Sequence, residues 1–177
     1  SSLRVFEVVL LGRMESLRLK VSDEDVAQVW EILRLLRLEH LAEQPFYALS
    51  GGQRRMVGIA QTMVREPEVL VLDEPTANLD MQHELKVLEL LRAYAEQRNV
   101  AVLLTLHDLN MAAQYADKLV LLKDGEVYRQ GTPSFVMTKE TIENTYHVQV
   151  HIENDSSGVP VLRPIRTLHG EEYRFTE

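Results

Sequence analysis

A short apolar segment, Val69–Leu72, ends directly in two carboxylates, Asp73 and Glu74. Continuous apolar runs of this length are typical of strands buried on both faces of a parallel sheet. A second run of the same kind covers residues 100–104, and leucines at helical spacing separate the two runs. Strand, helix and strand in that order predict a βαβ unit, so we expect an α/β fold with two buried parallel strands.

Three helices are expected ahead of this unit. The apolar residues 3–11 lack strict alternation, which favours a buried helix over a strand. Ser22 precedes three acidic residues, the pattern of an N-cap and a first helical turn. A glycine-rich turn at residues 50–52 leads into a third helix over residues 53–65, which ends before Pro67.

The C-terminal part is expected to combine short helices with antiparallel strands. Asp108 and Thr138 precede helical patterns, while Asp124-Gly125 and Gly158 favour tight turns. The strands expected around these turns cover residues 118–122, 126–129 and 148–152. Residues 165–177 are expected to form a tail.

The composition restricts the class of protein. With 177 residues and 45% hydrophobic content, one compact domain with a substantial core is expected. The net charge of -8 argues against a general nucleic-acid binder, which needs clustered Lys and Arg. The absence of cysteine excludes disulfides and thiolate metal sites. We find no apolar run of the roughly 20 residues that a membrane span needs.

Two segments have the residue types of a phosphate-transfer site. Ser50, Gly51, Gly52 and Gln53 stand at the start of a predicted helix, where small residues and the helix dipole favour an anion. Taken alone, such a turn is usually only a loop before a helix. In the second segment, Asp73 and Glu74 stand at the carboxyl edge of a predicted parallel sheet, where ligands collect. Their alternative role is to end the strand before Pro75.

Two further segments gain meaning only from their positions. Asp80, in the turn at residues 77–80, has the position of an ordinary helix N-cap. His107 follows the second apolar run, at the same predicted sheet edge as Asp73 and Glu74. A lone histidine there is usually structural. The other five histidines show no partner pattern.

Together, these four segments resemble the C-terminal two-thirds of ABC ATPases. Residues 49–53 look like the LSGGQ signature, residues 70–74 like Walker B with its catalytic glutamate, residues 77–80 like the D-loop and His107 like the switch histidine. The resemblance implies a P-loop NTPase (RecA-like) core with the ABC α-helical subdomain at its N-terminal end. It places the helical subdomain in residues 1–52, the rest of the core in residues 53–164 and a tail in residues 165–177.

The resemblance also implies a role for each residue. In this family two subunits enclose two ATP molecules head to tail, so Ser50, Gly51, Gly52 and Gln53 would contact the γ-phosphate held by the partner. Asp73 would hold Mg²⁺ through water, Glu74 would polarise the attacking water and His107 would stabilise the γ-phosphate. Asp80 would link the two sites. The implied cofactors are therefore ATP and Mg²⁺.

Four segments, at residues 8–13, 105–113, 122–125 and 131–133, resemble importers of the iron-siderophore, haem or cobalamin type. Such an importer implies a transmembrane permease docked near residues 8–19, a second nucleotide-binding subunit and, indirectly, an extracytoplasmic solute-binding protein. It also implies a peripheral location at the cytoplasmic face of the membrane. Met14-Glu15 departs from the family, where an aromatic residue and a proline usually follow Gly12-Arg13.

The printed sequence contains no Gly-x-x-x-x-Gly-Lys-Ser/Thr motif and no glutamine loop. Because that motif cradles the phosphates, we expect a truncated core that is inactive alone. Two alternatives to an importer subunit stay open: a non-transport ABC ATPase of the translation-factor or DNA-repair type, and a non-catalytic interaction module.

Overall fold

The computed structural model describes residues 3–14, 21–77 and 79–168 and divides the chain into two compact units. The N-terminal unit covers Ser1–Thr105 and the C-terminal unit covers Leu106–Glu177. The expectation of one compact domain was therefore wrong, because total apolar content does not determine how many cores a chain forms. The predicted boundaries at residues 52 and 164 separate functional parts and stay a prediction.

The N-terminal unit begins with the three predicted helices. They are α1 (Val5–Leu11), α2 (Asp23–Leu35) and α3 (Gly51–Met63), with short 3₁₀ turns at Glu39–Leu41 and Phe46–Ala48 between the last two. Ser22 caps α2 as predicted, and its side chain accepts a hydrogen bond from the Asp25 amide. The boundary of α3 differs from the prediction: Gly51 and Gly52 lie in the first helical turn rather than ahead of it.

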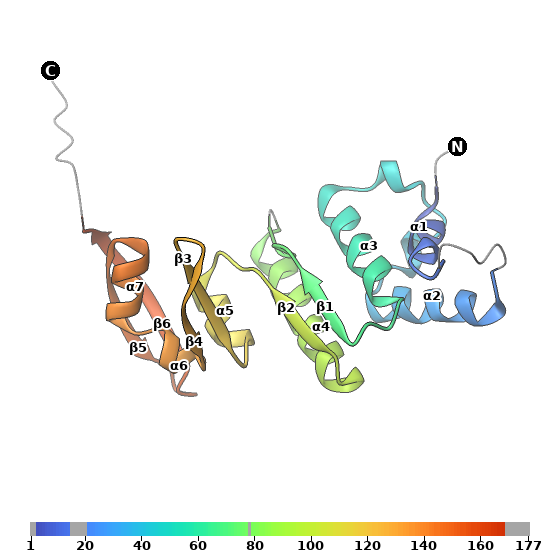
Figure 1. Ribbon diagram of the computed structural model, residues 1–177. Helices are drawn as coiled ribbons and strands as arrows, with labels where there is room; N and C mark the ends of the chain where they lie inside the picture. Colours follow the sequence, from blue (N-terminus) through green and yellow to red (C-terminus); the bar gives the residue numbers. More distant parts are fainter. Residues whose placement is uncertain (1–2, 15–20, 78, 169–177) are drawn as a thin grey trace, which may run out of the picture. The chain divides into compact units, whose positions relative to one another are not determined.

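The predicted βαβ unit follows these helices. It consists of β1 (Val69–Leu72), α4 (Met81–Arg98) and β2 (Ala101–Leu104), and β1 pairs with β2 in parallel (Figure 1). Leu72 lies opposite Leu104, so the residues that follow each strand emerge at the same edge. Asn99, in a left-handed conformation with φ 54°, ends α4 and turns the chain into β2.

Among the described residues, helices cover one face of the two strands and leave the other exposed, which corrects the prediction of fully buried strands. Leu70 is 0% exposed and packs in one core with α4 and the N-terminal helices. On the opposite face Val69, Val71 and Leu103 are 57%, 63% and 58% exposed. Since side chains alternate between the faces of a strand, one layer of helices covers only every second residue.

In its described residues, 106–168, the C-terminal unit has two antiparallel pairs of strands and three short helices. The predicted hairpin is present: Asp124 and Gly125 have φ angles of 52° and 81° and join its two strands. Asp108 and Thr138 cap helices, as predicted. In chain order the elements are α5 (Leu109–Tyr115), β3 (Leu119–Lys123), β4 (Glu126–Gly131), α6 (Pro133–Val136), α7 (Lys139–Tyr146), β5 (Val148–Asn154) and β6 (Pro160–Thr167).

Two features of this unit differ from the prediction. The short helix α6 was not expected. Residues 165–167, predicted to belong to the tail, continue β6, which pairs with β5. Residues 169–177 of the predicted tail lie outside the described residues. Among the helices that the structure describes, none is long and apolar enough to cross a membrane.

Candidate functional site

The carboxylates Asp73 and Glu74 follow β1, and Thr105 follows β2 at the same edge of the sheet. The Thr105 amide donates to the Leu72 carbonyl at 3.1 Å, which extends the strand pairing by one step. The Thr105 hydroxyl then donates to Asp73 Oδ1 at 2.7 Å and accepts from the Glu74 amide at 2.8 Å. A single hydroxyl group thus bridges both carboxylate residues.

Glu74 has a left-handed backbone, with φ 46°, at the start of a turn. Non-glycine residues in this region are uncommon and hold their conformation only when the surroundings fix it. Here the Glu74 carbonyl accepts hydrogen bonds from the Ala77 amide at 3.2 Å and from the guanidinium of Arg55 in α3. The turn that carries Glu74 is therefore fixed by α3 as well as by β2.

The N-terminus of α3 carries the predicted signature residues. Ser50 is the N-cap: its Oγ accepts from the Gln53 amide at 3.3 Å, while Gln53 Oε1 accepts from the Ser50 amide at 2.9 Å. Because Ser50 Oγ accepts in this capping box, its own proton can still donate to a ligand. Gly51 is exposed, and a Cβ added to Gly52 would lie 3.1 Å from Leu79 Cδ2. The signature segment thus packs directly against the turn before α4.

Asp80 caps α4, as predicted from its position. One carboxylate oxygen accepts from the His83 amide at 2.9 Å, and both oxygens lie 2.8 Å from His83 Nδ1. The backbone hydrogen bond from His83, followed by the bond from its ring, lowers the pKa of Asp80. His83, which shows no partner pattern in the sequence, thus pairs with Asp80 in the structure. Asn78, in the same predicted D-loop, lies outside the described residues.

His107 lies in the C-terminal unit, where it is exposed and precedes the cap of α5. The Asp108 carboxylate accepts from the amides of Asn110 and Met111 at 2.8 and 3.1 Å. Asn110 in turn bonds β6 through its side chain: Nδ2 donates to the Leu162 carbonyl at 3.1 Å and Oδ1 accepts from the Leu162 amide at 2.7 Å. The predicted closeness of His107 to the carboxylates stays a prediction.

A magnesium ion bound through water needs few direct protein ligands, because Mg²⁺ keeps several of its waters. In the described parts of the chain, no group of three or more His, Cys, Asp or Glu side chains is placed to hold a metal. Asp73 presents an exposed carboxylate whose Oδ1 is fixed by Thr105. This arrangement fits water-mediated binding of Mg²⁺ and does not fit a closed metal cage.

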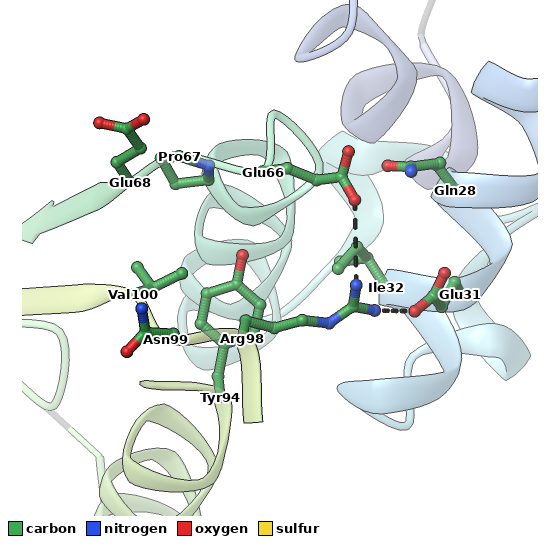
Figure 2. A pocket seen from close by; sticks show the side chains of 10 residues that line it. All are labelled: Gln28, Glu31, Ile32, Glu66, Pro67, Glu68, Tyr94, Arg98, Asn99 and Val100. Carbon is green, nitrogen blue, oxygen red and sulfur yellow. Dashed lines mark hydrogen bonds and ion pairs between the residues drawn. The ribbon is translucent and has the colours of Figure 1, made fainter. Parts of the chain in front are cut away.

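A pocket of about 220 Å³ lies at the opposite end of the strands, between α2, the loop before β1 and the end of α4 (Figure 2). Arg98 crosses it: one Nη bonds the Glu31 carboxylate and the other lies 3.9 Å from Glu66 Oε1. The Tyr94 hydroxyl, in the wall, donates to the Met63 carbonyl at 3.4 Å. These contacts connect α4 with α2, with α3 and with the loop before β1. They lie at the amino ends of β1 and β2, away from Asp73 and Glu74.

Comparison with known proteins shows which family the chain resembles. Residues 2–77 match the family model described as ABC transporter. An uncharacterised ABC transporter ATP-binding protein of Methanocaldococcus jannaschii is 42% identical over 161 residues, which cover 91% of this chain and 63% of that protein. The chain belongs to the ABC transporter family. A hemin import ATP-binding protein of Rhodococcus jostii is 38% identical to this ABC chain over 161 residues, covering 90% of it and 55% of the relative.

Solved structures place the fold in the same family. An ABC transporter assigned to the metal-chelate type, in an inward-facing conformation, superposes with a TM-score of 0.83 at 29% identity, covering 93% of this ABC chain and 67% of that chain. A dimeric ATP-binding cassette in a post-hydrolysis state, bound to ADP and Pi, gives a TM-score of 0.63 at 30% identity. The match covers 73% of this chain and 56% of that chain. The expected α/β cassette fold is confirmed. The ABC chain spans 63% and 55% of the lengths of the two relatives above.

Two residues that contact the predicted site were missed in the sequence. Thr105 had a visible signal, since a hydroxyl residue directly after a buried strand emerges beside the end of its parallel neighbour. Arg55 had no comparable signal, because a helix surface carries many arginines and only the packing of α3 shows which one reaches Glu74.

Proposed function

We propose that this chain is part of the ATP-hydrolysing subunit of an ABC importer for metal chelates of the iron-siderophore, haem or cobalamin type. The observation that carries the proposal is the pair Asp73 and Glu74 at the carboxyl edge of β1, bridged by Thr105. Ligands bind at this edge in open α/β sheets, and phosphoryl transfer needs both a metal-positioning carboxylate and a group that orients water.

The cofactors proposed for the site are ATP and Mg²⁺. When bound, Mg²⁺ neutralises charge on the phosphates. Asp73 would hold a water of the metal, and Glu74 would accept a proton from the attacking water as general base. His107 would donate a hydrogen bond to the γ-phosphate. These roles follow from the family resemblance and from the exposed placement of Asp73 and His107.

The signature segment is proposed to act on the nucleotide of a second subunit. Its suitability rests on the N-terminus of α3, where the dipole and the amides of Gly51, Gly52 and Gln53 favour an anion. Ser50 would add a hydroxyl donor, and Asp80 would link the two sites. The dimeric cassette to which this chain is similar was solved with ADP and Pi, which supports a dimer that binds nucleotide.

The proposed partners are a transmembrane permease, a second nucleotide-binding subunit and, through the permease, a solute-binding protein. The hemin import relative and the structure assigned to the metal-chelate type support this cargo class. The protein would then lie at the cytoplasmic face of the membrane as a peripheral subunit. Docking of the permease near residues 8–19 is also proposed, although residues 15–20 of that segment lie outside the described residues.

The test is the substitution Glu74→Gln in the natural full-length protein that carries this sequence, assembled with its permease. We expect phosphate release to fall by about 10²- to 10⁴-fold, because general-base catalysis contributes on that order. Binding of a labelled ATP analogue should be retained. Glu68→Gln is the matched control, since Glu68 is an exposed carboxylate at the other end of β1. Unchanged turnover in Glu74→Gln would rule out the general-base role.

The cargo class is tested separately, by ATP turnover of the complex reconstituted in liposomes. We expect stimulation by one class of ligand among ferric siderophores, haem and cobalamin, each presented with the cognate solute-binding protein. Turnover that none of the three stimulates would contradict the cargo proposal and leave the ATPase proposal intact.

A further inference from the structure

We propose that Thr105 is a positioning residue that sets the Asp73 carboxylate and the Glu74 backbone in their working arrangement through its hydroxyl group. The inference rests on the proposed function, because it concerns the same pair of carboxylates. Thr105 would contact neither the metal nor the attacking water, and would act through Asp73 and Glu74.

Thr105 lies directly beyond the paired ends of β1 and β2. Its amide donates to the Leu72 carbonyl at 3.1 Å, one step beyond the last paired residues of β1 and β2. The strand pairing therefore holds the Thr105 backbone beside the end of β1. With a branched side chain, Thr105 has restricted rotation about its Cα–Cβ bond, so the hydroxyl has few positions available.

The Thr105 hydroxyl group both donates and accepts a hydrogen bond. A hydroxyl group has one proton and two lone pairs. Thr105 Oγ1 places its proton on Asp73 Oδ1 at 2.7 Å and accepts the Glu74 amide at 2.8 Å. Because a carboxylate is planar, fixing Oδ1 also restricts the direction of Oδ2. The Thr105 hydroxyl is thus a neutral donor that orients the proposed metal-positioning group.

Glu74 is held through both polar groups of its main chain. Its amide bonds Thr105, while its carbonyl accepts from the Ala77 amide and from Arg55. Both polar groups of its main chain are therefore engaged, in a left-handed conformation with φ 46°. Removal of the hydroxyl would release one of these groups and widen the range of positions open to the Glu74 side chain.

The experiment compares Thr105→Val with Thr105→Ser in the natural full-length protein assembled with its permease. Valine keeps the shape of threonine without the hydroxyl, and serine keeps the hydroxyl. Thr62→Val is the matched control, because the Thr62 hydroxyl bonds the Gly58 carbonyl within α3, away from the carboxylates. Glu74→Gln is measured alongside to test the proposed function independently.

Three properties are measured: hydrogen exchange of the Glu74 amide, the affinity for Mn²⁺ with a non-hydrolysable ATP analogue, and kcat and KM for Mg·ATP. In Thr105→Val we expect faster Glu74 exchange and an affinity for Mn²⁺ weakened by about 10-fold, as is usual when a group that orients a metal ligand is lost. The value of kcat should decrease by a larger factor than KM changes. Thr105→Ser should restore all three properties.

Wild-type Glu74 exchange and Mn²⁺ affinity in Thr105→Val would overturn the inference, as would an equal loss in both Thr105 variants. If Glu74→Gln loses turnover while Thr105→Val keeps it, the proposed function stands and the inference fails. If Glu74→Gln keeps turnover, the proposed function fails, and the Glu74 exchange rates still show whether the hydroxyl fixes this turn.

Discussion

The guanidinium of Arg55, in the second turn of α3, donates a hydrogen bond to the main-chain carbonyl of Glu74. The same α3 begins with the signature residues, and Gly52 in its first turn packs against Leu79. Within one chain, the helix proposed to serve the nucleotide of the partner is thus tied to the turn that carries the proposed general base.

The first prediction concerns this bond. Arg55→Met keeps most of the side-chain stem and removes the donors, so the free energy of unfolding should fall by about 1–3 kcal/mol, the usual range for a lost bond from a charged group. Chemical denaturation measures the change. Arg54→Met is the control, because Arg54 is an exposed neighbour on the same helix. Equal stability of the two variants would contradict a specific role for the Arg55 bond.

The sequence predicted the elements of the fold well because their signals are local. Ser22, Ser50, Asp80 and Asp108 each cap a helix through contacts within three residues. The Asp124-Gly125 turn depends on its own φ angles. Local chemistry of this kind is readable from one segment at a time.

Features that depend on packing between distant segments were not readable in the same way. The one-sided cover of β1 and β2 depends on where α4 packs, and the bond from Arg55 joins residues 19 apart in sequence. The candidate site residues were predicted from their motifs and their order along the chain. Their precise contacts, including the bridge made by Thr105, required the structure.

The second prediction concerns Gly12, which follows α1. A Cβ added there would lie 2.3 Å from the Gln61 carbonyl oxygen and 2.7 Å from Val64 Cγ1, so the backbones of α1 and α3 would have to separate. Gly12→Ala should therefore destabilise the chain by about 1–3 kcal/mol or more, the usual cost of overpacking. A thermal melt measures the loss.

Gly58→Ala is the matched control for Gly12→Ala. Gly58 lies inside α3, is exposed and has nothing within 4 Å of an added Cβ. Alanine is the better helix former, so the free energy of unfolding of this variant should rise by about 0.5–1 kcal/mol. A Gly12→Ala protein as stable as Gly58→Ala would show that α1 and α3 do not pack as closely as described.

The third prediction concerns pH and the cap of α2. Hydrogen bonds from the Ser22 amide and hydroxyl, with a further one from Arg13, lower the pKa of Asp25 from 3.8 to about 2. Because the folded pKa lies below the unfolded value, the stabilisation is present above pH of about 4 and is lost as pH falls toward 2. Ser22→Ala should raise the Asp25 pKa toward its ordinary value, as measured by NMR titration of the carboxyl carbon.

The same substitution removes the side-chain cap and should cost about 1 kcal/mol at neutral pH. In Asp25→Asn, the loss of stability that this carboxylate causes as pH falls from about 4 toward 2 should be absent. An Asp25 pKa that stays near 2 in Ser22→Ala would assign the shift to the groups that this substitution leaves in place, the main-chain amide of residue 22 and Arg13, whose Nε lies 3.0 Å from Asp25 Oδ1.

The fourth prediction concerns Asn110, which pairs with Leu162 of β6 as a neighbouring strand would, donating at 3.1 Å and accepting at 2.7 Å. Asn110→Asp keeps the shape but sets a carboxylate oxygen against the Leu162 carbonyl. The free energy of unfolding of the variant should fall by about 1–3 kcal/mol, because the partly buried Leu162 carbonyl loses its donor. Hydrogen exchange of the Leu162 amide and chemical denaturation report the loss.

The pH dependence of Asn110→Asp distinguishes this contact from a general effect of charge. A protonated carboxyl group can again donate to the Leu162 carbonyl, so repulsion in the folded state should raise the pKa of the new carboxyl. The stability of the variant, relative to wild type, should then recover as pH falls below that pKa and decline as pH rises through it. Asn154→Asp, at an exposed position in β5, should change stability by no more than about 0.5 kcal/mol at either pH. A deficit in Asn110→Asp that is the same at pH 4 and pH 8 would mean that the amide pairing with β6 does not support the C-terminal unit.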